Sequence, residues 1–364
     1  MKILFIMSML RGRGAERVAS VLTEQLSSLS HKVFLICTGP RYGDEFPVSK
    51  DIHLDFITKK PGNPIILFYK RVHYLRRLIK TIKPDCIVSL ADARKLFLIT
   101  VAHLFSSVPM IFSERHDPVH NPKRKINRIM RLISYHACDR VVFQTEDARD
   151  FFSKSIAKKG IIIPNPIMEG LPDTRDQEQK PYIVNFCNLD PQKNLFLLLG
   201  AFSRIYKRYP SYRLVIYGEG GQAKDLKQLA EQLGIISRTD FFPHALDVHD
   251  RIKDAAMFVS SSDYEGQSNS MLEAMAMGLP CVCTDCPCGG ARAVITNGKN
   301  GLLVPVGDEE KLAEAMCYML DHPEEARRMG NSAAEIREER TPLIIAREWE
   351  KLLLETVSLS YKNH

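Results

Sequence analysis

Residues 264–280 of the chain read Tyr264-Glu265-Gly266-Gln267-Ser268-Asn269-Ser270-Met271-Leu272-Glu273-Ala274-Met275-Ala276-Met277-Gly278-Leu279-Pro280. A short polar run is followed by an unbroken run of good helix formers. Ser268 or Asn269 is suited to cap the start of the helix, and Gly278 is suited to end it. The pattern predicts a loop that leads into a helix near residues 268–277.

Two carboxylates flank the start of this helix. Glu265 lies on the loop, and Glu273 lies about one turn inside the helix. The free N–H groups and the positive dipole end of a helix start favour bound phosphate. We therefore expect a phosphate site with one acid on each side. The alternative is a solvated loop acid followed by a core helix that carries a stray Glu.

Strands and helices alternate on both sides of this stretch, which predicts two parallel α/β sheets with helices on both faces. Segments that favour strands are 2–8, 32–38, 85–90, 109–113, 140–144, 160–163, 182–187, 212–217, 256–260, 280–284 and 301–304. Segments that favour helices are 14–29, 66–83, 92–106, 122–137, 146–157, 193–208, 222–233, 268–277, 308–320 and 323–338.

The boundaries of two Rossmann-like domains follow from a break in this alternation. Residues 1–168 form the first domain, 169–181 have the composition of a linker, and 182–340 form the second domain. Ligands of such sheets bind at the carboxyl ends of the strands, so we expect a cleft between the two halves to hold them. The amphipathic tail 341–360 carries the only tryptophan, Trp349.

Composition favours a reduced, cytoplasmic protein. The chain has 364 residues with 45% hydrophobic and 26% charged residues, and no apolar run reaches the length of a membrane span. The N-terminus reads as a buried strand rather than a signal peptide. Nine cysteines, an odd number, fit free thiols better than a disulfide framework.

Charge is divided unevenly between the halves. Residues 1–170 hold 28 Lys and Arg against 15 Asp and Glu, whereas the remainder holds 22 against 28. A basic first half indicates an anionic surface or acceptor, either a membrane leaflet, a lipid diphosphate or nucleic acid. The basic amphipathic segment 65–80, and Lys123-Arg124-Lys125 with Arg128 and Arg131, are the candidates for a membrane-facing surface, although a solvated basic face is as good an interpretation.

The string from Glu265 to Pro280 resembles the signature of the retaining glycosyltransferases of family 4, in which two Glu are separated by seven residues. The resemblance covers nearly the whole chain, and it implies the GT-B fold of two Rossmann-like domains. It also implies that the last helix crosses back to the first domain. The roles that it implies are contact with the donor sugar for Glu265 and with the ribose for Glu273. Gly266 and the helix start Ser268, Asn269 and Ser270 are expected at the phosphate.

Three further loops resemble parts of the family pattern. Gly12-Arg13-Gly14-Ala15-Glu16-Arg17 is similar to a Gly-Gly-Ala-Glu-Arg loop, with Arg13 in place of the first glycine, so Gly14 is expected near the donor phosphate or the acceptor. His116 follows a predicted strand and is a candidate catalytic contact to a sugar hydroxyl, with Glu114 as an equal candidate. Gly218 is expected to line the nucleotide pocket, where a plain turn is an equally good interpretation.

The diphosphate site has one departure from the family pattern. Lys193 matches a family cation that holds the diphosphate and is expected to be both catalytic and nucleotide-binding. Asn188 stands where the family has arginine, and an amide neither neutralises charge nor forms a bidentate fork. Arg292 is the candidate replacement cation.

No metal is expected. Cys281, Cys283, Cys286 and Cys288 lie within eight residues, yet Cys281 and Cys283 alternate on a predicted strand without a second ligand pair downstream. Buried small side chains are the better interpretation. The sequence also lacks an Asp-x-Asp motif where this fold would use one.

The resemblance thus implies a hexosyltransferase that moves a hexose or N-acetylhexosamine from a nucleotide-diphosphate sugar, with UDP-sugar expected, to a lipid-linked or polysaccharide acceptor. It would need no cofactor and would work at the cytoplasmic face of an anionic inner membrane. The alternatives are another GT-B enzyme, such as a phosphorylase or nucleotide-sugar epimerase, and a non-catalytic sugar-nucleotide or nucleic-acid binding module. No basic platform rich in aromatic residues supports nucleic acid. The donor sugar, the linkage and the oligomeric state are not readable from the sequence.

Overall fold

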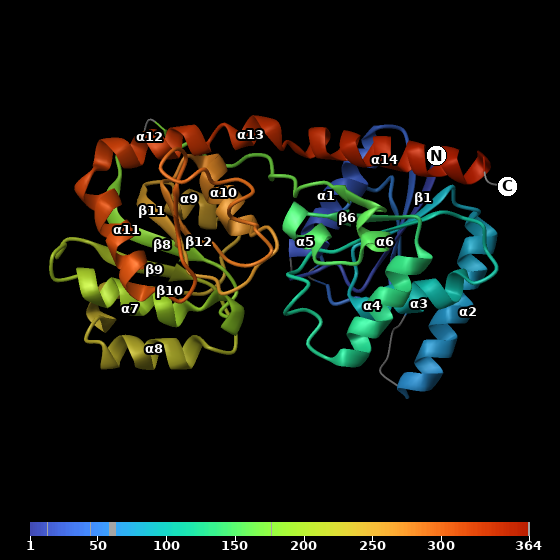
Figure 1. Ribbon diagram of the computed structural model, residues 1–364, viewed down its shortest axis with the longest axis horizontal. Helices are drawn as coiled ribbons and strands as arrows, with labels where there is room; N and C mark the ends of the chain where they lie inside the picture. Colours follow the sequence, from blue (N-terminus) through green and yellow to red (C-terminus); the bar gives the residue numbers. More distant parts are fainter. Residues whose placement is uncertain (13, 44, 58–62, 176, 363–364) are drawn as a thin grey trace. The chain divides into compact units, whose positions relative to one another are not determined.

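The computed structural model describes residues 1–12, 14–43, 45–57, 63–175 and 177–362, so Arg13 of the glycine loop lies outside the described residues. The chain divides into two compact units (Figure 1). One comprises Met1–Pro166 together with the C-terminal helix α14 (Pro342–Lys362), and the other comprises Ile167–Thr341.

The first unit is built on a seven-stranded parallel sheet in the order β3-β2-β1-β4-β5-β6-β7. The three central strands are buried along their length apart from Lys2, as expected of a parallel sheet covered on both faces. The strands are β1 (Lys2–Met7), β2 (Lys32–Cys37), β3 (His53–Phe56), β4 (Cys86–Ser89), β5 (Met110–Ser113), β6 (Arg140–Phe143) and β7 (Gly160–Ile162).

Helices cover both faces of this sheet. α1 (Gly14–Ser28) and α14 contact each other on one face, where Ile345, Trp349 and Leu353 are buried in the core beside β1 and β2. On the other face α3 (Ala93–His103) lies between α2 (Pro64–Ile82) and α4 (Lys125–Ala137) and contacts both (Figure 1). α5 (Glu146–Asp150) and α6 (Lys154–Ala157) connect β6 to β7.

The second unit repeats the plan with six parallel strands in the order β10-β9-β8-β11-β12-β13. The strands are β8 (Lys180–Phe186), β9 (Arg213–Tyr217), β10 (Thr239–Phe242), β11 (Ala255–Ser260), β12 (Cys281–Thr284) and β13 (Leu302–Val304). The helices are α7 (Leu195–Ile205), α8 (Ala223–Gln232), α9 (Val248–Ile252), α10 (Asn269–Met277), α11 (Glu309–Asp321), α12 (Pro323–Ala333) and α13 (Ile336–Glu339), with short 3-10 turns at Pro191–Lys193 and Ile236–Arg238. α7, α8 and α11 pack on one face, and α9 and α10 pack on the other.

The two-sheet α/β architecture expected from the sequence is therefore present. The segment 169–181, which has a linker composition, packs onto the second unit: the Thr174 backbone N–H and hydroxyl both donate to Met277 O, at 2.8 and 2.9 Å. Ile167 and Leu171 are buried in the core beneath α10.

Several elements and one surface residue differ from expectation. Helix α9 was not expected, and the helix expected over 323–338 is broken into α12 and α13. β3 and β10 were not expected, because each has only four residues and a mixed polar pattern. The helix expected over 146–157 is broken into α5 and α6. Arg131 was expected on a basic surface, but it is 3% exposed and forms an ion pair with Glu114.

No helix of the described residues has both the length and the apolar character needed to cross a bilayer.

Candidate functional site

Glu265 and Lys193 form a largely buried ion pair in the second unit. Glu265 lies on the loop between β11 and α10, and Lys193 lies on the turn that follows β8. The Lys193 ammonium contacts Glu265 Oε1, and the two side chains are only 15% and 13% exposed. Gln192 Nε2 donates to the same oxygen at 3.2 Å. Two sequence-predicted site residues are thus in direct contact.

Backbone and side-chain hydrogen bonds hold these two loops together. The Asp263 N–H donates to Gln192 O at 2.9 Å, and the Ser261 hydroxyl donates to Lys193 O at 3.0 Å. Asn194 Nδ2 donates to Asp263 Oδ1 at 2.7 Å. Because both strands end at the same edge of the parallel sheet, short loops suffice to bring the two charges together.

The charge of Lys193 is maintained by its surroundings. Burial, the largest influence, lowers the pKa of Lys193, but the negative charge of Glu265 and its hydrogen bond to the ammonium outweigh burial and raise that pKa. Lys193 is therefore a permanent cation and is not suited to serve as a proton acceptor. Removing either partner would leave a buried charge uncompensated, which typically costs about 3–5 kcal/mol in a fully buried pair and less at this partial exposure.

The second acid, Glu273, is held by a histidine that the sequence analysis did not identify. Glu273 is 4% exposed on α10, and its Oε2 lies 2.8 Å from Nε2 of His249 on α9. The His249 ring packs edge-on against Phe186, with ring centroids 5.6 Å apart and an interplanar angle of 85°. No motif around His249 relates it to Glu273, since the contact depends on how α9 and α10 pack on the same face of the sheet.

The start of α10 follows the expected sequence boundaries. Ser268 is the N-cap residue, but its side chain makes no capping hydrogen bond, and its hydroxyl lies 3.0 Å from the hydroxyl of Ser270. The helix ends at Gly278, which has φ of 94° as a left-handed cap requires. Asn269 begins the helix between the two serines.

Glycines allow close approach of the loops around the site. An added Cβ at Gly290 would lie 1.8 Å from Gly266 O, next to Glu265. An added Cβ at Gly218 would lie 1.9 Å from Cys187 O. The loop that carries Asn188 is therefore packed against the Gly218 turn, and Leu189 N–H donates to Glu219 O at 2.9 Å.

The expected replacement cation has another partner. Arg292 Nε lies 2.7 Å from Asp285 Oδ1, and the two side chains are 49% and 34% exposed. Asn188 is exposed. Cys281, Cys283, Cys286 and Cys288 are buried. Burial raises the pKa values of Cys281, Cys283 and Cys286, that of Cys286 to about 12, so those three thiols stay protonated.

In the first unit, Gly14 and His116 follow β1 and β5 at the carboxyl edge of the sheet. Gly14 is the exposed first residue of α1, and His116 is exposed. Glu114 is instead buried and accepts hydrogen bonds from Arg131 Nη1 at 3.0 Å and from the Tyr135 hydroxyl at 3.2 Å. Of the two candidates in this loop, His116 is thus the one whose ring faces solvent.

Two protein-family models match the chain. The family model described as "Glycosyltransferase Family 4" matches residues 12–168, and the model described as "Glycosyl transferases group 1" matches residues 171–336.

Two curated relatives from Campylobacter jejuni match almost end to end. The chain is 25% identical to "GalNAc-alpha-(1->4)-GalNAc-alpha-(1->3)-diNAcBac-PP-undecaprenol alpha-1,4-N-acetyl-D-galactosaminyltransferase", over 98% of this chain and 99% of that protein. It is 27% identical to "N-acetylgalactosamine-N,N'-diacetylbacillosaminyl-diphospho-undecaprenol 4-alpha-N-acetylgalactosaminyltransferase", over 96% and 98%. The structure of Anabaena Alr3699/HepE in complex with UDP matches with a TM-score of 0.79 and 18% identity, over 98% of this chain and all of that chain.

The contact between Gly290 and Gly266 generates a prediction. Gly290→Ala forces the Glu265 loop to move, so we expect a loss of about 1–3 kcal/mol in the free energy of unfolding, as in other overpacked sites. Urea unfolding would measure the loss. The matched control is Gly221→Ala, where an added Cβ meets no atom within 4 Å. Equal stability of the two variants would contradict the tight contact.

Proposed function

This chain belongs to glycosyltransferase family 4 and has its GT-B fold, and on that premise we propose that it is a retaining hexosyltransferase. Its donor would be a nucleotide-diphosphate sugar, with UDP as the nucleotide, and its acceptor a lipid-linked saccharide. The observation that carries the proposal is the contact between Glu265 and Lys193 beside the start of α10, with Glu273 on the same helix.

Lys193 is proposed to hold the donor diphosphate. An ammonium that is permanently charged and only 15% exposed stabilises phosphate charge more strongly than one in bulk water. Backbone N–H groups at the start of α10, with Gly266, Ser268, Asn269 and Ser270, would add neutral donors to the same anion. The proposed diphosphate site thus uses one strong cation, Lys193. Asn188 and Gly218 would line the edge of this site. Arg292 could add charge only by breaking its ion pair with Asp285.

Donor binding would change the partner of Lys193. A diphosphate carries more negative charge than one carboxylate, so it competes with Glu265 for the ammonium. Glu265 would then be free to contact a hydroxyl of the donor sugar, as the resemblance implies. The pair therefore keeps a cation in the empty site without leaving it unpaired.

The proposed reaction breaks the bond between the anomeric carbon and the diphosphate oxygen. The acceptor hydroxyl forms its new bond to that carbon on the same face, and its proton passes to the leaving oxygen. Lys193 stabilises the charge on that oxygen, and His116 would hold a sugar hydroxyl from the first unit. In this proposal catalysis rests on positioning and charge stabilisation, without an enzyme-bound sugar.

Glu273 is proposed to accept a hydrogen bond from the ribose of the donor. His249 would fix this carboxylate, because its Nε2 engages Oε2 while the Phe186 ring restrains the imidazole. His249 is thus a positioning residue that acts through Glu273.

The relatives support the nature of donor and acceptor. The names of both Campylobacter enzymes state transfer of N-acetylgalactosamine to saccharides on undecaprenyl diphosphate, and HepE was solved with UDP. An N-acetylhexosamine donor and a polyprenyl-diphosphate saccharide are accordingly our proposed substrate classes. Such an acceptor would be anchored in a membrane, and we propose that the enzyme works at the cytoplasmic surface of an anionic leaflet.

The enzyme is also proposed to work without a metal ion. Among the described residues, no group of three or more His, Cys, Asp or Glu is arranged to hold one. Lys193 and the helix start would supply the positive charge that a divalent ion supplies elsewhere.

The first test of this function separates chemistry from binding. We expect Glu265→Ala to lower turnover by roughly 10²–10³-fold, the usual effect of losing one transition-state contact, while UDP binding stays equal or becomes tighter because Lys193 loses its competitor. Lys193→Ala should weaken UDP binding. Turnover assays and calorimetry would measure both, and loss of UDP binding by Glu265→Ala protein that is still folded at the assay temperature would refute the assignment.

A second test concerns His249. Wild-type protein should bind UDP about 10–100-fold more tightly than the 2′- or 3′-deoxy analogue that lacks the contacted hydroxyl, since hydrogen bonds to charged groups contribute about 1.5–3 kcal/mol. Glu273→Gln and His249→Leu should both reduce this preference, and His249→Gln, which retains an N–H donor, should restore part of it. His322→Leu is the control, as His322 is exposed in the same unit. If His249→Leu left the preference unchanged, His249 would have only a packing role.

A third test removes metal ions. Turnover with excess chelator should equal turnover with added Mg²⁺ or Mn²⁺. Activity that disappears with chelator and returns on adding a divalent ion would rule out metal independence.

A further inference from the structure

Helix α4 has its aliphatic side chains on the exposed face and its polar side chains on the buried face, the reverse of an ordinary amphipathic helix. Its buried residues are polar or aromatic, namely Arg131, Ser134 and Tyr135. Its exposed residues include four large aliphatic side chains: Ile126 at 54%, Ile129 at 52%, Leu132 at 39% and Ile133 at 46% exposure. An apolar stripe of this kind normally faces the core, so its exposure needs an explanation.

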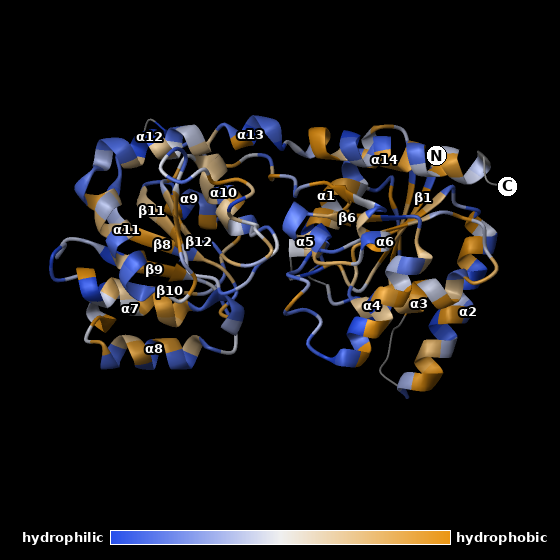
Figure 2. Cartoon of the chain, in the orientation of Figure 1, coloured by the Kyte–Doolittle hydropathy of each residue, from blue (hydrophilic) through white to orange (hydrophobic). Residues whose placement is uncertain are grey.

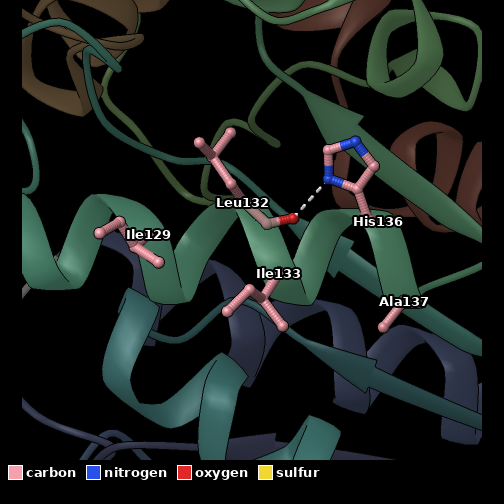
Figure 3. A pocket seen from close by; sticks show the side chains of 5 residues that line it. All are labelled: Ile129, Leu132, Ile133, His136 and Ala137. Atoms are coloured by element: carbon pink, nitrogen blue, oxygen red, sulfur yellow. Dashed lines mark hydrogen bonds between the residues drawn. The ribbon is translucent and has the colours of Figure 1, made fainter.

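The apolar stripe forms a continuous surface. Ile129, Leu132, Ile133, His136 and Ala137 line an open hollow of about 500 Å³, and their spacing is that of one helix face (Figure 3). The imidazole of His136 is engaged with its own helix, with Nδ1 at 2.8 Å from Leu132 O. An apolar partner could therefore cover this face while His136 Nδ1 keeps its hydrogen-bond partner, Leu132 O.

Arg131 prevents the helix from turning its apolar face inward. Its Nη1 donates to Glu114 Oε2 at 3.0 Å and to Asn121 O at 2.6 Å, and its Nη2 donates to Pro118 O at 3.1 Å. Rotating α4 would break all three bonds and leave the buried carboxylate of Glu114 without its cation. The exposure of the isoleucines is thus enforced by the core.

Basic residues surround this apolar face. The sequences of α2, α3 and α4 contain no Asp or Glu. At its N-terminal end α2 adds further exposed apolar side chains, Ile65, Ile66 and Tyr69, so that orange and blue alternate along the outside of α2 and α4 in Figure 2. The exposed cations on α2, on α3, and on α4 with the two residues before it are Lys70, Arg77, Lys80, Arg94, Lys123, Arg124, Lys125 and Arg128.

The positive charge around α4 favours a membrane leaflet over a second copy of the chain as the partner of this face. A second copy of the chain docked through the same face would bring two sets of cations together, which disfavours the contact. A leaflet with anionic head groups offers negative charge at its surface and an apolar layer beneath it, which matches cations that flank isoleucines.

We propose that the outward face of α4, with the start of α2, inserts into the head-group boundary of an anionic membrane. The proposal rests on the lipid-linked acceptor of the proposed function and adds the element that enters the lipid. α2 and α4 both begin at the carboxyl edge of the sheet, where the Gly14 and His116 loops also lie. Insertion of this end would present those loops to an acceptor held in the leaflet.

Fluorescence tests insertion without any turnover. Trp349 is the only tryptophan and is fully buried, so it should not respond to lipid. In Ile133→Trp, a blue shift should appear with vesicles of equal parts phosphatidylglycerol and phosphatidylcholine, and should persist at high salt once the protein is bound. A probe at Leu354→Trp, on exposed α14 surface of the same unit, should show none. Equal shifts at both positions, or none at Ile133→Trp, would overturn the proposal.

Substitutions test how much the exposed isoleucines and the flanking cations contribute to vesicle binding. Ile129→Gln with Ile133→Gln should weaken vesicle binding by about tenfold for each isoleucine. The matched control is Leu343→Gln with Leu354→Gln, exposed apolar residues on α14. Lys123→Gln, Arg124→Gln and Lys125→Gln together should reduce the preference for phosphatidylglycerol, by roughly fivefold for each charge.

Two further measurements show whether lipid or a second copy of the chain covers α4, and whether the membrane contact and the proposed donor stand or fail independently. If light scattering shows a dimer that the two Ile→Gln substitutions dissociate, while vesicle binding is unchanged, the partner is a second copy and the lipid proposal fails. UDP binding, measured on the same variants, should be unaffected. Wild-type protein that binds vesicles through α4 but does not bind UDP would refute the proposed donor and leave the membrane contact standing.

Discussion

The site depends on a single constraint: a lysine and a glutamate of opposite charge are kept together where water has little access. Lys193 and Glu265 come from loops after different strands, and each would be unfavourable alone at its degree of burial. Their contact, with the hydrogen bonds between residues 192–194 and 261–263, joins the ends of β8 and β11 into one rigid edge. The start of α10 and the Gly290 contact are built onto that edge.

This arrangement suits a site whose ligand comes and goes. A cation placed to receive a diphosphate must have a partner when the ligand is absent, and Glu265 supplies one at little structural cost. Under the proposed function the same carboxylate is released by the ligand that displaces it. Glu273 has a different support: His249 orients it from the neighbouring helix, so its position does not depend on the ligand.

The sequence predicts the parts of this protein that follow from local pattern. The alternation of strands and helices and the ends of α10 follow from periodicity, helix formers and Gly278. The family resemblance assigns Lys193 and Glu265 to the same donor site, but their direct ion pair is seen only in the structure. β3 and β10 are too short and too polar for a strand pattern. The contact of His249 with Glu273 depends on tertiary packing, and the period of α4 does not tell which face is buried, because the decisive factor is the ion pair of Arg131 with Glu114.

The position of α14 has a consequence for the order of events during synthesis. Trp349 completes the core beside β1 and β2, yet it is encoded after the whole of the second unit. A growing chain therefore carries the first sheet with one flank of its apolar core uncovered until α14 has left the ribosome, whereas residues 167–341 can already close their own core. The N-terminal half, although translated first, is the last to reach its final packing.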